Sequence, residues 1–327
     1  MKIIKKDYID LYKTMYLIRR TEEIIAENYS KQLMRCPVHL SIGQEAPATG
    51  VCKALTKKDM IISTHRSHAH YLAKGGDLYK MLSELHGKKD GSASGLGGSM
   101  HLQDYESGIV ASVPIVGSTI PIGVGIAMAN KKLNKKSIVT IFFGEGATEQ
   151  GVFFESLNFA KLHNLPILFV CENNLYSVYT HLLKRQPKQR NVVKIAESLG
   201  IPASSHDGND VLKVYEISKK IRKEIYNKSK PILIEFNTYR WLEHCGPNYD
   251  DYLSYRPKGE LSNWQKKCPI KKIEKEIIYR KHSFKEVDKI KSVINKTIMK
   301  NFIKAEKADF PNLKSMNDLT FSKKSFL

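Results

Sequence analysis

The sequence predicts an α/β fold, in which a mostly parallel, twisted sheet carries helices on both faces. Three consecutive segments carry this prediction: an apolar, β-branched run at 137–143, helical spacing at 152–163, and a second apolar run at 167–171. Strand, helix and strand in this order form a βαβ unit, whose two strands lie parallel. The chain has 327 residues and a 42% apolar fraction, enough for one large or two modest domains with a real core.

Each strand of this unit ends in a polar loop. Gly144 and Gly146 bracket Glu145 after the first strand, and Asn174 follows the second. Parallel strands end at the same edge of a sheet, where ligands bind. Glu145 and Asn174 offer hard oxygen atoms that suit Mg²⁺ or Ca²⁺. Glu149 stands where a dinucleotide-binding fingerprint needs glycine, so the pattern favours a magnesium-bridged phosphate over a nicotinamide site. The alternative is an ordinary buried βαβ unit with a glycine turn.

The string GEGATEQG, followed by NFA, LP and FVCENNLYS, resembles the thiamine-diphosphate motif of the α subunits of 2-oxo acid dehydrogenases. These are the E1 components of the pyruvate, branched-chain and acetoin dehydrogenase complexes. The family usually has GDG, and glutamate at the acidic position is similar to the branched-chain type. The resemblance spans about residues 8–311. It implies that Mg²⁺ is held by Glu145, Asn174 and the Tyr176 carbonyl, and that the cofactor touches Gly144, Gly146 and Ala147.

The N-terminal part begins with an amphipathic helix, predicted over 7–34 from apolar residues at helical spacing. A short loop and a second helix, ending near residue 55, follow. The string HLSIGQEA at their junction is similar to the family's H-x-x-x-GQEA, whose histidine contacts the cofactor. This resemblance assigns His39 to the cofactor site, against the alternative of a loop histidine without a role.

A short strand at 60–63 ends in a loop with three histidines and an arginine, in the string STHRSHAHYLAKG. Arginine suits a phosphate because its planar fork reads two oxygen atoms at once. One alternative is a zinc cluster of alternate histidines on an extended strand, and another is a solvated basic loop. The string resembles acetoin-type α subunits most closely. That resemblance implies that His65 and Arg66 hold the diphosphate and that His68 lines the active site.

A helix at 77–86 and a glycine-rich loop at 87–104 come next. The loop's GLGGSMH is similar to the family's GKGGSMH, with Leu96 in place of lysine. Further on, Val116 occupies a stretch whose backbone contacts the aminopyrimidine ring of the cofactor in the family. Pro114 replaces the usual glycine there. A helix of small residues follows.

Beyond the central unit, the polar and basic segment 178–189 is predicted to be a flexible loop, ordered by cofactor or partner. A last strand at 232–237 leads to the string TYRWLEH, similar to the family's TYR-x-x-x-H. The resemblance makes His244 an active-site residue on a loop that closes over the cofactor. Leu242 replaces a second histidine that is common in pyruvate enzymes.

We expect residues 1–260 to form a thiamine-diphosphate-binding α/β domain with an N-terminal helix. Residues 261–327 are expected to form a helical segment that packs on the same domain and makes subunit contacts. The net charge is +20, but 43 of the basic residues are lysines spread along the chain and only ten are arginines. Nucleic-acid sites favour arginine and aromatic platforms, so no nucleic acid is expected. No apolar run reaches the roughly 18 residues of a membrane span, so no membrane is expected either. Five scattered cysteines without CxxC spacing favour a reducing cytoplasm and argue against structural zinc.

The resemblance implies an oxidoreductase acting on an aldehyde or oxo group with a disulfide acceptor. With thiamine diphosphate and Mg²⁺ it decarboxylates a 2-oxo acid, or cleaves acetoin, and passes the product unit to a lipoyl E2 partner. His39, His68 and His244 are expected to supply proton transfer or hydrogen bonds. The glutamate that activates the aminopyrimidine lies on a separate β subunit in this family. The chain is therefore expected to be inactive alone and to work as an α₂β₂ heterotetramer. The alternative is a thiamine-dependent decarboxylase or carboligase without a lipoyl partner, in a biosynthetic pathway.

Overall fold

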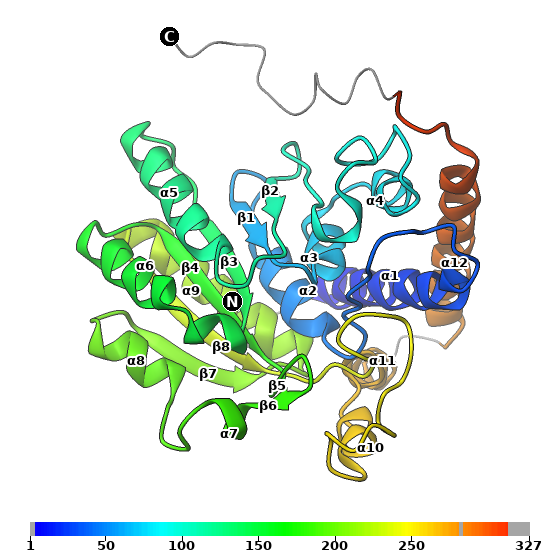
Figure 1. Ribbon diagram of the computed structural model, residues 1–327. Helices are drawn as coiled ribbons and strands as arrows, with labels where there is room; N and C mark the ends of the chain where they lie inside the picture. The colour runs from blue at the N-terminus through cyan, green and yellow to red at the C-terminus, as the bar shows by residue number, and fades with distance from the viewer. Residues whose placement is uncertain (1–3, 281–283, 313–327) are drawn as a thin grey trace.

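The computed structural model describes residues 4–280 and 284–312. Within these residues, six parallel strands form one sheet in the order β2-β1-β3-β4-β8-β7 (Figure 1). The strands of this sheet are β1 Met60–Ser63, β2 Ile109–Ser112, β3 Val139–Gly144, β4 Ile167–Asn173, β7 Ala203–Asp207 and β8 Ile232–Asn237. A separate antiparallel pair consists of β5 Tyr176–Ser177 and β6 Thr180–His181. The predicted α/β fold with a parallel sheet is confirmed.

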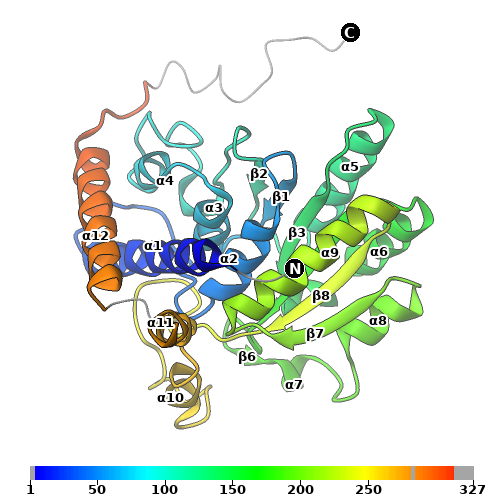
Figure 2. The same cartoon turned by 180° about the vertical axis from the view of Figure 1, so that it is seen from behind.

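Helices cover both faces of the sheet, as the two opposite views show (Figures 1 and 2). The helices are α1 Lys5–Tyr29, α2 Glu45–Ala54, α3 His68–Lys74, α4 Leu78–Leu85, α5 Thr119–Lys132, α6 Gly151–Leu162, α7 Leu182–Arg185, α8 Val192–Ser198, α9 Val211–Lys228, α10 Glu260–Gln265, α11 Pro269–Tyr279 and α12 Phe284–Lys307. Helices α5, α6 and α8 pack on one face. Helices α2, α3 and α9 pack on the other, with α1, α4 and α12 outside them.

Strand β3 shows why helices pack on both faces of the sheet. Side chains alternate along a strand, so Ile141 and Phe143 enter the core under α5 and α6, whereas Phe142 enters the core on the opposite face. All three are buried. A strand that is apolar on both faces is typical of a parallel sheet between two helical layers.

One helix ends clearly earlier than the sequence-based expectation. Helix α1 ends at Tyr29 instead of residue 34, because Gln32 adopts a left-handed backbone with φ of 58° that no helix can continue. The chain then turns back and buries Met34. Helix α5 starts two residues before Pro121, which its first turn tolerates because the proline's missing N–H would have no helical partner there.

The C-terminal helix α12 joins the core that includes the sheet. Ile298 and Phe302 of α12 belong to the same apolar cluster as sheet residues, and α12 packs against α4 and α1. Residues 313–327 of the predicted C-terminal segment lie outside the described residues. Among the described helices, none has both the length and the apolarity that a membrane crossing requires.

The order of the strands in the sheet by itself predicts where a ligand binds. The chain passes from β1 to β2 on one side, and then returns to place β3 on the other side of β1. The strand order therefore reverses between β1 and β3. Open α/β sheets bind ligands at such a switch point, outside the carboxyl ends of the strands.

Candidate active site

A cavity of about 200 Å³ lies at the carboxyl ends of β1, β3 and β4. Every predicted site residue except His68 lines it: His39, His65, Arg66, Val116, Gly144, Glu145, Gly146, Ala147, Asn174, Tyr176 and His244. These residues come from segments spread over some two thirds of the chain. A larger cavity of about 620 Å³ lies on the other side of the glycine-rich loop, beside Glu84 and Phe310, and none of the predicted site residues lines it.

His68 does not line the cavity, contrary to the expectation. It is the first residue of α3, and its side chain is fully buried. Its Nε2 atom lies 2.7 Å from Oγ of Ser99, and its Nδ1 atom lies 3.4 Å from Oε1 of Glu22. His68 therefore connects α1 to the glycine-rich loop.

The alternative of a zinc cluster formed by alternate histidines on a strand is wrong, because residues from 68 onward are helical. His70 turns away from His68. Its Nδ1 atom lies 2.7 Å from Oγ of Ser63, and its Nε2 atom lies 3.2 Å from Oε1 of Glu172. Glu172 lines the cavity and was not recognised as a site residue, although it directly precedes the two asparagines.

The turn after β3 places a buried carboxylate at the cavity. The 3₁₀ turn η2, Glu145–Glu149, begins as the strand ends, and Glu145 is only 4% exposed. Burial raises the pKa of Glu145, and the nearby positive charge of Arg185 opposes that rise. A Cβ atom on Gly146 would lie 3.0 Å from Oγ of Ser177, so glycine keeps this backbone close to the neighbouring loop.

Arg185 is the main site residue that sequence reasoning missed. Its Nη2 atom lies 2.6 Å from Oε1 of Glu145, and it also pairs with Glu149. Arg190 donates a hydrogen bond of 2.9 Å to Thr148 in the same turn. The segment predicted to be a flexible loop is thus anchored to η2 by Arg185, and Arg190, which follows that segment, adds a second contact. No spacing rule in the sequence relates these arginines to the turn that carries Glu145. Only the basic character of the segment indicated that it could contact a carboxylate.

Asn174 is held in place from two sides. Its amide nitrogen donates to Oε1 of Gln44 at 3.0 Å, and its amide oxygen accepts from the Tyr176 backbone N–H at 3.1 Å. A carbonyl oxygen has two lone pairs, so this oxygen can accept one further partner. Gln44 also lines the cavity, and its place in the GQEA string is the signal that it belongs to the site.

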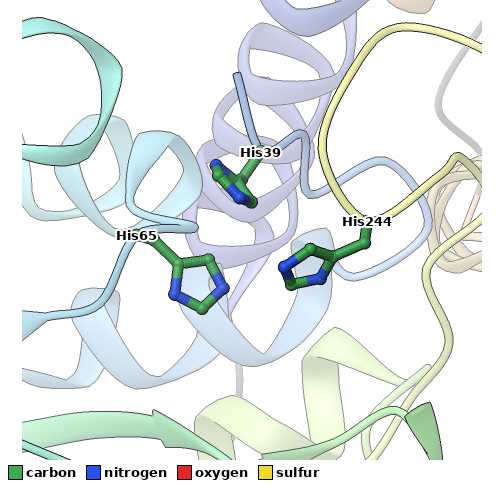
Figure 3. A group of neighbouring side chains, drawn as sticks. All are labelled: His39, His65 and His244. Atoms are coloured by element: carbon green, nitrogen blue, oxygen red, sulfur yellow. The ribbon is translucent and has the colours of Figure 1, made fainter. Parts of the chain in front are cut away.

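Three histidine rings from different loops face one another at the cavity (Figure 3). The ring centroid of His39 lies 4.7 Å from that of His65 and 5.0 Å from that of His244. The ring centroids of His65 and His244 lie 5.4 Å apart. Arg66 ties their loops together, because its guanidinium donates to the Leu40 carbonyl at 2.6 Å and to the His244 carbonyl at 3.0 Å. Arg66 therefore positions these rings as well as bringing positive charge.

The three rings are uncharged at neutral pH. Burial, followed by the charge of Arg66, lowers the pKa of His39 to about 2, of His65 to about 4 and of His244 to about 3. Each ring thus keeps one nitrogen with a free lone pair and one N–H donor. Nδ1 of His39 is buried without a hydrogen-bond partner among the described residues. A buried polar atom without a partner costs free energy, so the site is prepared for a polar ligand.

The lowered pKa values of these histidines predict that the folded chain loses stability in acid. An unfolded histidine takes up a proton below pH 6.5, whereas His39 in the folded chain does not, so the unfolded state binds more protons there. The free energy of unfolding should fall as the pH drops from about 6.5 towards 4, by up to about 1.4 kcal/mol per pH unit for His39. Urea unfolding at pH 7.5 and 5.5 should show that His39→Asn is less acid-sensitive than the wild type. His163→Ala, a change at the partly exposed end of α6, should behave like the wild type, and equal acid sensitivity of all three would contradict the prediction.

The residues at the cavity fit the cofactor that the sequence predicts. Hard oxygens of Glu145 and Asn174 suit Mg²⁺, and Arg66 with the histidine N–H groups suits phosphate oxygens. The unpartnered Nδ1 of His39 gives a reason for an acidic or polar group to sit beside it. The cavity is smaller than the roughly 300–1,000 Å³ of a complete small-molecule pocket, which fits a site that holds only one end of its ligand.

A family model described as dehydrogenase E1 component matches residues 13–314, which is most of the chain. The chain belongs to the dehydrogenase E1 component family. It is 36% identical over 286 residues to the chloroplastic pyruvate dehydrogenase E1 component subunit alpha-3 of Arabidopsis thaliana, covering 85% of this chain and 66% of that protein. It is 33% identical over 302 residues to pyruvate dehydrogenase E1 component subunit alpha of Rickettsia bellii, covering 91% of each. The corresponding subunit of Porphyra purpurea is 33% identical over 331 residues, covering 98% of this chain and 95% of that protein.

These findings confirm the resemblance read from the motifs. The chain is an E1 chain of the α type from the thiamine-diphosphate-dependent 2-oxo acid dehydrogenases. The similar relatives named above are all subunits of pyruvate dehydrogenases.

Proposed function

We propose that this chain is the α subunit of an E1 enzyme that binds thiamine diphosphate and Mg²⁺ in this cavity. The enzyme decarboxylates a 2-oxo acid, pyruvate in the first place, and passes the acyl unit to a lipoyl E2 protein. One observation carries the proposal: residues assigned to the cofactor from separate motifs line a single cavity at the switch point of the sheet.

Each part of the cavity has a role in this proposal. The Glu145 carboxylate, the Asn174 amide oxygen and the Tyr176 carbonyl hold Mg²⁺. Arg66 and the N–H groups of His39 and His244 face the phosphate oxygens. Thiamine diphosphate, when bound, supplies a carbanion and an electron sink for the reaction. The protein's part is to hold the charged end and to keep neutral imidazoles beside it, each with one N–H donor and one nitrogen that accepts a hydrogen bond.

Arg185 competes with Mg²⁺ for Glu145 in this proposal. Its guanidinium lies against the buried carboxylate at 2.6 Å, and a positive charge there opposes a divalent cation. Arg185→Gln should therefore tighten Mg²⁺-dependent cofactor binding about five-fold, the equivalent of roughly 1 kcal/mol for a partly buried ion pair. Calorimetric titration of thiamine diphosphate at several Mg²⁺ concentrations measures this. Lys184→Gln, which removes an exposed neighbouring charge, should leave binding unchanged. Weaker binding by Arg185→Gln would mean that Arg185 supports the metal ligand instead.

The partner in this proposal is a β subunit, in an α₂β₂ assembly. The small cavity leaves most of a cofactor uncovered. Helices α5 and α6 pack on each other and expose large apolar side chains that a partner would cover: Ile122, Phe154, Phe159 and Leu162. All five cysteines are free thiols, which supports a reducing compartment, and the proposed location is the cytoplasm.

Co-expression with a β-type E1 subunit from the same genome tests the function. The purified pair should bind thiamine diphosphate only with Mg²⁺ and should oxidise pyruvate or another 2-oxo acid with a dye acceptor. Acetoin belongs in the same substrate series. The chain alone should show no turnover. Acylation of a lipoyl domain separates an E1 enzyme from a decarboxylase or carboligase, and full turnover by the chain alone would refute the need for a β subunit.

A further inference from the structure

We propose that His39, His65 and His244 form a binding site for a divalent transition metal ion, Zn²⁺ in the first place, when no diphosphate occupies the cavity. Such a metal ion would exclude the diphosphate of the cofactor. This site is separate from the oxygen ligands Glu145 and Asn174. The first half of the proposal, that the site binds a metal ion, does not depend on the proposed reaction.

The geometry of the three rings carries the inference. One ligating nitrogen from each ring lies within 4.8 Å of the other two. The three residues come from three loops and point toward a common centre (Figure 3). In tetrahedral zinc sites the Zn–N bonds are about 2.0–2.1 Å, which separates the nitrogens by roughly 3.3 Å. Contraction by about 1.5 Å at most, shared between side chains on loops, therefore assembles three ligands.

The chemistry of the rings selects the ion. Neutral imidazole nitrogen suits zinc and related first-row metals, whereas Mg²⁺ and Ca²⁺ prefer oxygen. Zn²⁺ also has no geometric preference from its d-electrons, so it accepts ligands set by loops. Nδ1 of His39 has no hydrogen-bond partner among the described residues, so metal binding would break no such bond there. Three protein ligands leave a fourth position open to water.

Arg66 limits the affinity of this site. One of its guanidinium nitrogens lies 3.5 Å from Nδ1 of His244, so a metal ion approaches against a positive charge. Glu172 lines the same cavity, and its negative charge offsets part of that repulsion. His244 keeps its second nitrogen for the metal, since Arg66 faces only Nδ1.

Metal and diphosphate binding should be mutually exclusive. The three histidines are also the side chains assigned to the cofactor, and their loops cannot contract around an ion and remain open for a phosphate. Linkage makes this reciprocal: if Zn²⁺ weakens diphosphate binding, the diphosphate weakens Zn²⁺ binding by the same factor. This second half rests on the proposed function.

The first experiment measures metal binding by the tag-free, full-length chain after chelator treatment. Calorimetry should show one Zn²⁺ per chain, and Co²⁺ should give a visible d–d band typical of low coordination number. Single changes of His39, His65 or His244 to alanine should each weaken Zn²⁺ binding by at least about 10- to 100-fold, the loss caused even by removing an outer-shell partner. His163→Ala and Cys245→Ser serve as controls, because the first removes a histidine at the end of α6 and the second an exposed thiol next to His244.

Binding that persists in all three alanine variants, or that is lost in Cys245→Ser, would overturn the metal site. A thermal unfolding curve checks that each variant is folded. The second experiment titrates the Zn²⁺-loaded chain with Mg²⁺ and thiamine diphosphate, with a protein-free titration to correct for metal chelated by the diphosphate. Simultaneous, independent binding of both would overturn the exclusion. Zn²⁺ binding by the chain, together with no Mg²⁺-dependent cofactor binding by the zinc-free αβ pair, would overturn the proposed function and leave the metal site standing.

Discussion

Replacing Glu145 with alanine is expected to abolish Mg²⁺-dependent binding of thiamine diphosphate. Glu145 contributes the only carboxylate among the proposed metal ligands, and it is almost fully buried at the cavity. Mg²⁺ in phosphate sites relies on one or two carboxylates. Removal of a group that only supports a metal ligand weakens metal binding up to about 100-fold, so removal of the ligand itself should weaken cofactor binding at least about 100-fold. Calorimetric titration of the αβ pair with thiamine diphosphate, with and without Mg²⁺, measures the effect.

Three further variants make this test specific. Glu145→Gln keeps the shape of the side chain without its charge and should lose binding as well. Glu145→Asp, the more usual residue of the motif, should retain it. Glu155→Ala removes an exposed carboxylate on the neighbouring helix and should bind like the wild type. Normal cofactor affinity in both Glu145→Ala and Glu145→Gln would remove Glu145 from the metal site.

Replacing Asp250 with alanine is expected to lower the free energy of unfolding by about 3–5 kcal/mol, the cost of leaving buried cations unpaired. Asp250 forms ion pairs with two guanidinium groups. Its Oδ2 atom lies 3.4 Å from Nη1 of Arg240, and its Oδ1 atom lies 3.1 Å from Nη2 of Arg256. Asp250 and Arg240 are each only 1% exposed. Urea unfolding monitored by circular dichroism measures the loss.

The same network positions His244. Arg240 and Arg256 both donate to the carbonyl of Leu242, at 2.6 and 3.1 Å, two residues before the histidine. Asp250→Ala should therefore also weaken cofactor binding. Asp251→Ala removes an exposed neighbour and should change the free energy of unfolding by no more than about 0.5 kcal/mol. A loss below about 1 kcal/mol in Asp250→Ala would show that the two cations do not depend on this carboxylate.

Much of the fold followed from local patterns. The strands at 60–63 and 232–237 have the predicted bounds, and the central βαβ unit is shifted by at most two residues at any end. These elements are short, apolar and closed by glycine or polar residues, so their conformation depends mainly on neighbours along the chain. Bounds shifted where a single backbone angle decided them, as at Gln32.

The sequence by itself determined the chemistry of the site: a carboxylate after one strand, a carboxamide after the next, and Arg66 with histidines on other loops. Motif order and parallel-strand geometry sufficed to bring these residues to one edge. Only the tertiary structure decided which histidines meet there, because His65 joins His39 and His244 while His68 turns into the core. It likewise decided that Arg185 covers Glu145. Such contacts join residues tens to hundreds of positions apart, and their geometry depends on how whole loops pack, which no local spacing records.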